Sequence, residues 1–460
     1  MGCRMTLFCC LAGLLGMFPA GAASPPLTVL LRRSGLPERY AGRVVPGKVL
    51  IPSVYRAPGA EMRGVWFITH GNIDFPRQKT DAEFRAALRN VFSALAARHF
   101  NTVFFQVRPD CDAYYASRIN PWSRSLTGVE GVPLPGHTDP LTVAVQEARR
   151  HGMKLYAWFN PYRVTEATRL TKLRYLATLS PGNFARKNPH LVLSVPLKQG
   201  RSLLFLNPGE PEVIRHVTET VREIAEKYPV DGVVFDDYFY PYMDIGNADA
   251  ASFVKNNPRN LSRKDWRVEN VNRLILSVRG MLKSCQKKTG RPIPFGISPF
   301  GIWANRRDRA GGSLSEGDSS LLTLYADSRG WVRRNEIDFV IPQIYWSFGH
   351  NTAAYAALAD WWTEQVRGTR VKLYIGMAAY RVGEAGDWQN PYELLNQIRY
   401  NTKHPEIAGQ VFCNTRSVLY PANAIQQNTM RLLLTRYWTT RVPDSRAPFN
   451  PLVLSSPQGK

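Results

Sequence analysis

The stretch DGVVFDDYFYP (231–241) decides the fold of this chain. Its first part, GVVF, contains β-branched and aromatic residues that favour a strand. The run is apolar at consecutive positions, so we expect both faces of the strand to be covered, as in a parallel sheet between layers of helices. Two aspartates and several aromatic residues follow directly. Polar residues at the end of such a strand are typical of a barrel enzyme.

Seven further runs of the same kind alternate with longer amphipathic stretches. They are RGVWFI (63–68), TVFFQV (102–107), KLYAWF (154–159), PFGISP (294–299), DFVIPQIY (338–345), KLYIGM (372–377) and GQVFCN (409–414). Between the first two, Phe84, Leu88, Val91 and Leu95 recur at the spacing of one helix face. Eight strand–helix units predict an α/β fold, a (β/α)8 TIM barrel with long loops at the strand C-terminal ends. A ninth apolar run, LLFLNP (203–208), leaves the strand count open by one.

The two ends of the chain have other roles. Residues 1–23 combine a short basic start, an apolar run and small residues near the end, which is typical of a secretory signal peptide. We therefore expect a periplasmic or cell-envelope location, with a lipid anchor as the second alternative and no transmembrane span. Residues 24–60 are interpreted as an N-terminal arm, 61–440 as the barrel and 441–460 as a C-terminal tail.

The chain is strongly basic. Lys and Arg outnumber Asp and Glu by 59 to 36, for a net charge of +23. Predicted export and the lack of a dedicated basic tail argue against nucleic acid as the partner. An acidic extracellular polymer fits better, because a positive surface field concentrates polyanions. The alternative is a solvated basic surface with no specific partner.

Cysteines and motifs exclude several classes of protein. After removal of the signal peptide, Cys111, Cys285 and Cys413 remain, which allows one disulfide at most and leaves a pairing of Cys111 with Cys413 open. They show no CxxC spacing, so we predict no metal site. HExxH, Gly-x-Ser-x-Gly, phosphate-loop and dinucleotide motifs do not occur, so we predict no cofactor.

The predicted strand ends carry aromatic rings, amides and arginines. Rings stack on sugar faces, whereas amides and guanidinium groups bind hydroxyls and carboxylates, so this combination indicates a glycan site. The candidate substrate-binding residues are Arg108, Trp158, Asn160, Tyr162, Arg163, Tyr240, Trp303, Gln343, Tyr345 and Trp346. We expect the aromatic residues Trp158, Tyr240, Trp303, Tyr345 and Trp346 to line a cleft long enough for several sugars.

Glycoside cleavage needs two carboxyl groups. Strand alternation turns Asp236 toward the barrel axis and Asp237 sideways, where we expect it to brace a loop. Asp110 is the preferred second carboxylate, because it follows a strand end and Arg108 beside it lowers its pKa. Asp112, Asp237 and Glu384 remain open as alternatives.

The aspartate pair and His70 each have a simpler interpretation. The Asp236–Asp237 pair can cap a turn or bind calcium instead of reacting with substrate. His70, after the first strand, is expected to be a hydrogen-bonded structural residue rather than a base.

Nine strings of this sequence resemble those of the glycosyl hydrolase-like family 10 proteins of the bacterial envelope. They are RGVWF (63–67), FQVRPDCDAYY (105–115), PWSRSLTG (121–128), DPL (139–141), YAWFNPYR (156–163), FLNPG (205–209), DGVVFDDYFYP (231–241), FGISPFGIW (295–303) and IPQIYW (341–346). The resemblance spans roughly residues 60–420. It implies a (β/α)8 barrel that hydrolyses peptidoglycan glycan strands, preferably those stripped of stem peptides, in proteins that include divisome-localised hydrolases. Asp236 and Asp237 match the family's paired aspartates. Enteric members are typically lipoproteins, but no cysteine stands at the cleavage site here.

The sequence thus predicts a glycoside hydrolase acting on peptidoglycan strands, with envelope or division proteins as further partners. Arg108 and Arg163 are expected to bind the muramic-acid carboxylates that stem-peptide removal exposes. A non-catalytic glycan-binding barrel that recruits division or wall-remodelling proteins is the alternative. A glycosidase for another polysaccharide is the third interpretation. Retaining or inverting stereochemistry stays open.

Overall fold

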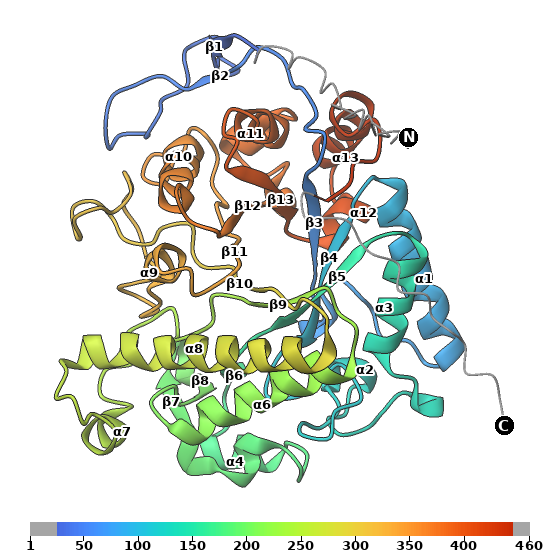
Figure 1. Ribbon diagram of the computed structural model, residues 1–460, viewed down its shortest axis with the longest axis vertical. Coiled ribbons are helices and arrows are strands. Elements are labelled where there is room, and N and C mark those ends of the chain that lie inside the picture. The colour runs from blue at the N-terminus through green and yellow to red at the C-terminus, as the bar shows by residue number, and fades with distance from the viewer. Residues whose placement is uncertain (1–24, 445–460) are drawn as a thin grey trace, which may run out of the picture.

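The computed structural model describes residues 25–444 and contains a closed barrel of eight parallel strands (Figure 1). In the order of hydrogen bonding around the ring they are β3 (Met62–Phe67), β4 (Thr102–Arg108), β5 (Lys154–Phe159), β9 (Gly232–Phe235), β10 (Phe295–Ile297), β11 (Phe339–Val340), β12 (Lys372–Met377) and β13 (Ile407–Phe412). β13 pairs with β3 and closes the ring. Each predicted run supplies one of these strands, which confirms the (β/α)8 fold.

The ninth apolar run is a strand outside the barrel. It forms β8 (Ser202–Leu206), the middle strand of a three-stranded antiparallel sheet with β6 (Arg163–Thr168) and β7 (Val192–Pro196). This inserted sheet lies in the chain between β5 and β9. With it come α4 (Lys172–Ala177), α5 (Phe184–Lys187) and the short 3-10 helices η3 (Pro189–Leu191) and η4 (Lys198–Gly200). The strand count of eight is therefore right, and the extra run belongs to an insertion.

Helices surround the barrel (Figure 1). The longer ones are α1 (Asp81–Ala97), α3 (Pro140–Arg150), α6 (Pro211–Lys227), α8 (Arg263–Thr289), α10 (Tyr355–Val366), α11 (Glu393–Asn401) and α13 (Ala424–Leu432). The shorter ones are α2 (Arg124–Thr127), α7 (Ala250–Lys255), α9 (Ser328–Arg333), α12 (Thr415–Leu419), η1 (His70–Asn72), η2 (Pro135–His137), η5 (Ala379–Arg381), η6 (Gly386–Gln389) and the π-helical turn η7 (Leu433–Tyr437).

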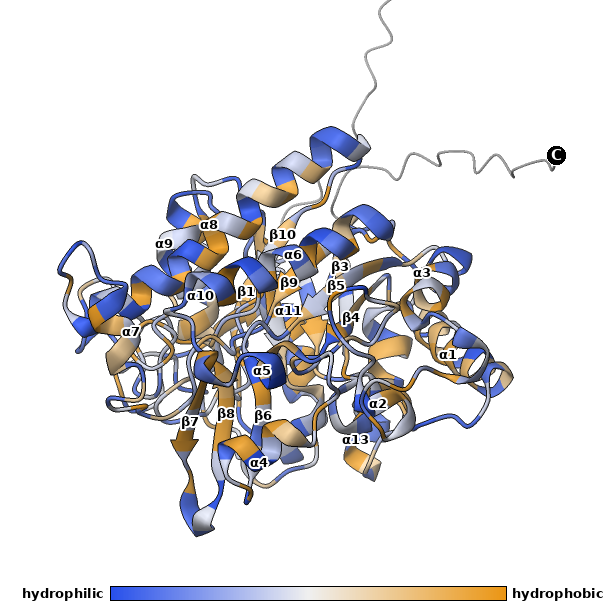
Figure 2. Cartoon of the chain, turned by 90° about the horizontal axis from the view of Figure 1, so that it is seen from below, coloured by the Kyte–Doolittle hydropathy of each residue, from blue (hydrophilic) through white to orange (hydrophobic). Residues whose placement is uncertain are grey.

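Helix α1 shows how the sequence sets these elements. The Thr80 hydroxyl accepts from the Glu83 backbone N–H, and the Glu83 carboxylate accepts from the Thr80 N–H, so a capping box begins the helix. Phe84, Leu88 and Leu95 are buried, as their spacing predicts. Figure 2 shows hydrophilic and hydrophobic residues alternating along α6 and α8, as amphipathic helices that cover a sheet require.

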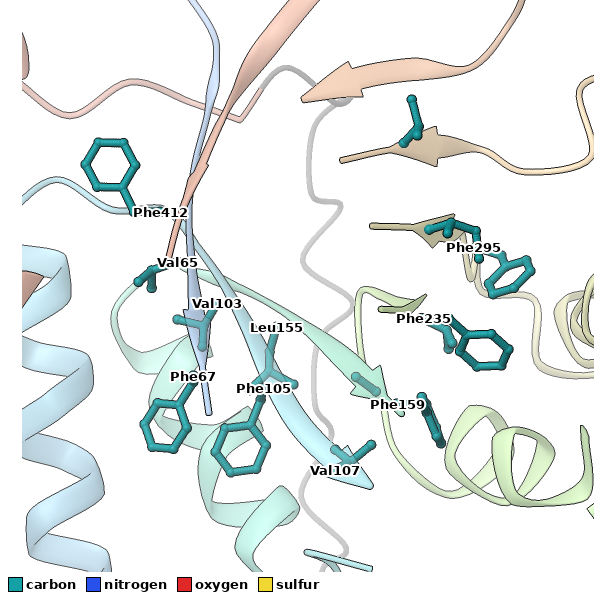
Figure 3. Close-up of a cluster of buried hydrophobic side chains, with 14 of the residues drawn as sticks. Val65, Phe67, Val103, Phe105, Val107, Leu155, Phe159, Phe235, Phe295 and Phe412 are labelled. Atoms are coloured by element: carbon teal, nitrogen blue, oxygen red, sulfur yellow. The ribbon is translucent and has the colours of Figure 1, made fainter. Parts of the chain in front are cut away.

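Two apolar layers hold the barrel together. The first fills its interior with Met62, Trp66, Phe104, Tyr156, Trp158, Val234, Phe339, Ile341, Tyr374 and Val411. The second lies between strands and helices, and Figure 3 shows part of it, including Val65, Phe105 and Phe235. Gly296 makes room in the interior, because a Cβ there would lie 2.1 Å from the Phe339 ring.

The N-terminal arm forms a small antiparallel pair, β1 (Leu27–Val29) with β2 (Leu50–Pro52), and β2 contacts α11. Residues 1–24 and 445–460, which hold the predicted signal peptide and most of the predicted tail, lie outside the described residues. Cys111, Cys285 and Cys413 are free thiols, so Cys111 and Cys413 do not pair. Within residues 25–444, no helix is long and apolar enough to cross a bilayer.

Candidate functional site

A cavity of about 220 Å³ opens at the C-terminal ends of the barrel strands. Its lining comes from seven of the eight strand ends and from the inserted sheet: Trp66, Ile68, His70, Ile73, Gln106, Trp158, Arg163, Glu166, Asp236, Asp237, Tyr238, Tyr242, Ser298, Gln343, Tyr345 and Cys413. Sites that enclose a drug-sized ligand measure roughly 300–1,000 Å³. This cavity therefore suits one ring of a longer ligand rather than the whole of it.

Asp236 follows the last residue of β9 and lines the cavity. Its neighbour Val234 lies inside the barrel, as alternation predicts. One carboxylate oxygen, Oδ2, accepts hydrogen bonds from Trp158 Nε1 at 2.9 Å and Asn160 Nδ2 at 3.3 Å, and the other accepts from the Tyr238 backbone N–H at 3.2 Å. Three N–H donors therefore surround a carboxylate that is only 4% exposed.

Asp237 lines the same cavity, so the prediction that it turns sideways is wrong. Its Oδ1 accepts from Gln343 Nε2 at 3.0 Å, and its Oδ2 accepts from the Tyr242 hydroxyl at 2.8 Å. Strand β9 ends at Phe235, and the chain turns immediately afterwards. The two-residue alternation consequently stops before the aspartates, and both carboxylates reach the cavity.

Burial raises the pKa of both aspartates. For Asp236, the adjacent Asp237 charge raises the pKa further, whereas Arg163 and the Trp158 hydrogen bond oppose the rise. For Asp237, hydrogen bonds from Tyr242 and Gln343 oppose the effect of burial on the pKa. Two interacting carboxylates titrate as a pair, so this pair keeps a proton to a higher pH than two isolated aspartates would.

A second charged group borders the cavity. Arg163 Nε lies 2.9 Å from Asp110 Oδ1, and Arg163 Nη1 lies 2.7 Å from Glu166 Oε1. The His70 ring lies between the same carboxylates, with Nδ1 3.4 Å from Asp110 and Nε2 3.5 Å from Glu166. Two cations and two anions thus form a closed ring, which we call the charged ring. Its formal charge sums to zero when His70 is protonated.

The charged ring sets the protonation of its members. Burial opposes the charge of His70, but Asp110 and Glu166 outweigh burial and raise the pKa of His70 to about 9. Burial likewise acts against ionised Asp110, and His70 and Arg163 outweigh it, so the pKa of Asp110 is lowered. The expected lowering is present, but Arg108 is not its cause. Asp110 is absent from the cavity lining, so the structure gives it a supporting position behind His70 and Arg163.

Glu166 is the carboxylate that the sequence did not single out. It lies on β6 of the inserted sheet, lines the cavity, and its side chain is half exposed. The hydrogen bond with His70 is the main reason that its pKa is lowered. The β-branched residues Val164, Thr165 and Thr168 were the available signal for an additional strand.

Of the remaining predicted substrate-binding residues, Trp158, Arg163, Gln343 and Tyr345 line the cavity. Arg163 is 6% exposed, and Nε and Nη2 both donate to the Pro109 carbonyl in addition to its two ion pairs. The guanidinium N–H groups of Arg163 therefore already bond to acceptors of the protein. The expected two-point binding of a substrate carboxylate by Arg163 is not supported. Asn160 lies behind Asp236, where it is fully buried and outside the lining.

The structure does not bring Arg108 to the cavity. The register between β4 and β5 shifts between Gln106 and Arg108, which breaks the alternation that placed both on one face. Gln106 lines the cavity, whereas Arg108 is fully buried and donates from Nη1 to the carbonyls of Asn160 and Pro161.

The long aromatic cleft is not present either. Tyr162 and Tyr240 are buried in the core. Trp303 is buried with Nε1 donating to Asp327 at 3.1 Å, and Trp346 packs against the core outside the cavity lining. The rings that do line the cavity besides Trp158 and Tyr345 are Trp66, Tyr238 and Tyr242.

The other carboxylate alternatives lie elsewhere. Asp112 is buried and accepts from the Asp110 backbone N–H at 3.3 Å, and Glu384 pairs with Arg381 at 2.8 Å, both outside the cavity lining. In the described part of the chain, no group of three or more His, Cys, Asp or Glu side chains is arranged to hold a metal ion.

An eight-stranded parallel barrel with a buried carboxylate pair in a cavity lined by aromatic rings, at the strand C-terminal ends, is the architecture of a barrel glycosidase. The model of the family described as glycosyl hydrolase-like 10 matches residues 61–394, and the chain belongs to this family. Family membership supports a glycosidase-type function.

Named relatives agree with this assignment. The chain is 37% identical to glycosyl hydrolase YngK of Bacillus subtilis (strain 168) over 360 residues, 76% of this chain and 67% of the relative. It is 38% identical to glycosyl hydrolase DigH of Escherichia coli (strain K12) over 378 residues, 78% of this chain and 84% of the relative. Among solved structures, the PgaB (BpsB) glycoside hydrolase domain from Bordetella bronchiseptica aligns with a TM-score of 0.48 at 14% identity, covering 82% of this chain and 98% of that one.

Proposed function

We propose that this protein is a glycoside hydrolase that cleaves the glycan strands of bacterial peptidoglycan, preferentially strands without stem peptides. The observation that carries the proposal is the Asp236–Asp237 pair, because both carboxylates line one cavity and both have a raised pKa. Hydrolysis of a glycosidic bond needs one carboxyl group that donates a proton and one that is ionised. A pair that retains one proton supplies both forms side by side.

The hydrogen bonds assign a role to each member. Three N–H donors contact Asp236 and two donors contact Asp237. Burial and the neighbouring charge raise the pKa of Asp236 to about 7, against about 6 for Asp237, but the additional N–H donor favours the ionised form of Asp236 when a substrate covers the cavity. We therefore assign Asp236 the base or charge-stabilising role at the anomeric carbon. Asp237 then carries the proton and donates it to the glycosidic oxygen as the C–O bond to the leaving sugar breaks. Water supplies the hydroxyl group on the anomeric carbon, and its remaining proton returns to the carboxylate pair.

The rest of the cavity positions the sugar. Trp66, Trp158 and Tyr345 offer apolar ring surfaces to a pyranose, and Gln343 donates to Asp237 from the loop after β11, two strands away around the ring. The charged ring fixes Arg163 at the cavity wall without leaving a net charge there. Attraction of a polyanionic strand therefore comes from basic residues outside this cavity.

The location belongs to the same proposal. The signal-like residues 1–23 support export to the periplasm or envelope, where peptidoglycan lies. N-terminal sequencing of the exported protein should begin near Ala23 or Ser24, and a mature chain that starts at a lipidated cysteine would contradict an unanchored protein.

The test compares purified peptidoglycan before and after amidase treatment, with products identified by mass. The wild-type protein should release glycan fragments mainly from the amidase-treated strands. Asp236→Asn and Asp237→Asn should each reduce the rate by about 100-fold or more. Asp231→Asn is the matched control, because Asp231 lies at the opposite end of β9, outside the cavity lining, and accepts from the Leu155 backbone N–H. Strand binding without cleavage by the wild-type protein would indicate the glycan-binding alternative instead.

A further inference from the structure

A second cavity lies on the outside of the barrel, between the N-terminal arm and the last helices. Its volume is about 490 Å³, larger than that of the catalytic cavity, and the two share no lining residue. One wall is the end of β1 with the residues that follow it, and the other is formed by α11, the residues just before it, and η7. Figure 1 labels β1 and α11. We call it the outer cavity.

The outer cavity is cationic. Four arginines line it, namely Arg32, Arg33, Arg399 and Arg436, and its lining contains no Asp or Glu. Arg32 is neutralised by Glu38 at 3.0 Å. Within residues 25–444 the other three arginines form no ion pair with a carboxylate. Three guanidinium groups without a carboxylate partner give the outer cavity a net positive charge, which attracts an anion.

Hydrogen bonds hold two of these guanidinium groups in place, those of Arg399 and Arg436. Arg399 donates from Nη1 to the Ser53 carbonyl at 3.3 Å and from Nη2 to Asn396 Oδ1 at 3.0 Å. Its Nε–H is buried and has no hydrogen-bond partner. Arg436 Nη1 donates to the Tyr392 hydroxyl at 3.2 Å. The guanidinium groups of Arg33 and Arg436 are exposed, so they can donate hydrogen bonds to an oxyanion of a ligand.

We propose that the outer cavity binds the carboxylates of an acidic glycan strand. Planar guanidinium groups match the two oxygens of a carboxylate, and the neighbouring Tyr392 ring and Asn390 amide suit the ring face and hydroxyls of a sugar. The arginine of the catalytic cavity is committed to the charged ring. The outer cavity therefore supplies the carboxylate recognition that the catalytic cavity lacks. The identity of the glycan rests on the proposed function, whereas the preference for an oxyanion does not.

The binding test uses the mature chain with Asp236→Asn, so that strands stay intact. In this background, Arg33→Gln with Arg436→Gln removes two exposed guanidinium groups of the outer cavity. Lys283→Gln with Lys287→Gln removes the same charge from the exposed face of α8 and is the matched control. Melting temperatures check that both variants fold. Binding to amidase-treated strands is measured by sedimentation, with chitin as the neutral glycan.

The arginine variant should bind amidase-treated strands roughly 5- to 30-fold more weakly, whereas the lysine control should lose less than about twofold. Chitin binding should be the same in all three proteins. Equal losses in the arginine and lysine variants would overturn the proposal, because they would attribute binding to overall charge. Inorganic phosphate is the other oxyanion probe. One combination of results would overturn the glycan assignment. In it, phosphate stabilises only the proteins that retain Arg33 and Arg436, and the arginine variant still binds strands as strongly as the parent protein.

Catalysis separates this proposal from the proposed function. In the protein with intact Asp236, Arg33→Gln with Arg436→Gln should leave cleavage of short soluble strand fragments unchanged and slow the cleavage of long strands. If no protein cleaves any strand but the binding pattern holds, the proposed function fails and the outer cavity stands. If cleavage is normal and the arginine variant binds long strands as well as the control, the outer cavity proposal fails alone.

Discussion

The hydrogen bond from Trp158 Nε1 to Asp236 Oδ2, 2.9 Å long and buried, gives a direct test of the carboxylate pair. Trp158→Phe removes this donor and keeps an aromatic ring in the barrel interior. A hydrogen bond to a charged group contributes about 1.5–3 kcal/mol. One pKa unit corresponds to about 1.4 kcal/mol, so the loss should raise the pKa of the pair by about 1–2 units.

The direction of this pKa shift follows from the protonation state that the indole N–H stabilises. The indole N–H stabilises the Asp236 carboxylate, so without it the carboxylate ionises only at higher pH. The acid limb of the kcat/KM profile, which reports ionisation of the pair in the free enzyme, should move upward by about 1–2 pH units. At a fixed pH on that limb the rate should fall about 10- to 100-fold, and raising the pH should recover most of it.

The assay is cleavage of soluble strand fragments over a range of pH values. Trp66→Phe is the matched control, because Trp66 lines the same cavity, contacts Trp158 edge-on at 4.9 Å between ring centroids, and has an indole N–H that is buried without a hydrogen-bond partner. It should lose ring contacts without moving the acid limb. An unchanged or downward-shifted profile for Trp158→Phe would refute the assignment of Asp236 as the ionised member.

Two further predictions concern the charged ring and the barrel interior. Arg163→Ala should lower the free energy of unfolding by about 3–5 kcal/mol, because it leaves two carboxylates with a single cationic partner, and thermal or chemical denaturation measures this loss. The same variant should slow the cleavage of carboxylated and neutral oligomers equally. A loss of activity confined to carboxylated strands would show that Arg163 binds a substrate carboxylate, and would contradict its assignment to the charged ring. Gly296→Ala should destabilise the barrel by about 1–3 kcal/mol, because its Cβ would collide with Phe339. Gly280→Ala, with open space around its Cβ on α8, should instead stabilise the protein by about 1 kcal/mol, and equal effects of the two changes would refute the packing argument.

The barrel could be predicted from the sequence because its strands are buried on both faces. The consecutive apolar residues of β4 and β5 and the helical spacing of Phe84, Leu88 and Leu95 are strong local signals that tertiary packing reinforces. The position of Asp236 at the cavity could also be predicted from the sequence, because the C-terminal ends of parallel strands meet at one face of the barrel.

The composition of the cavity could not be predicted residue by residue. Alternation holds only while a strand continues, and β9 ends before Asp236. The irregular register after Gln106 removed Arg108 from the site, and no local pattern announces such a shift. Glu166 reaches the cavity because β6 pairs with β8, about forty residues later in the chain. Pairing over that separation depends on tertiary structure, which periodicity does not encode.

The inserted sheet and the barrel strands contribute different parts of the cavity lining. The aspartate pair lies on the barrel itself, where a change of backbone disturbs eight strands at once. Glu166 lies on β6, whose only strand partner is β8 of the same insertion. Exchange of residues 163–206 between homologues would therefore alter the part of the cavity lining that Arg163 and Glu166 form and leave the Asp236–Asp237 pair in place. The residues that the insertion contributes to the cavity can therefore be changed together, as one segment, without changing the strand that carries the carboxylate pair.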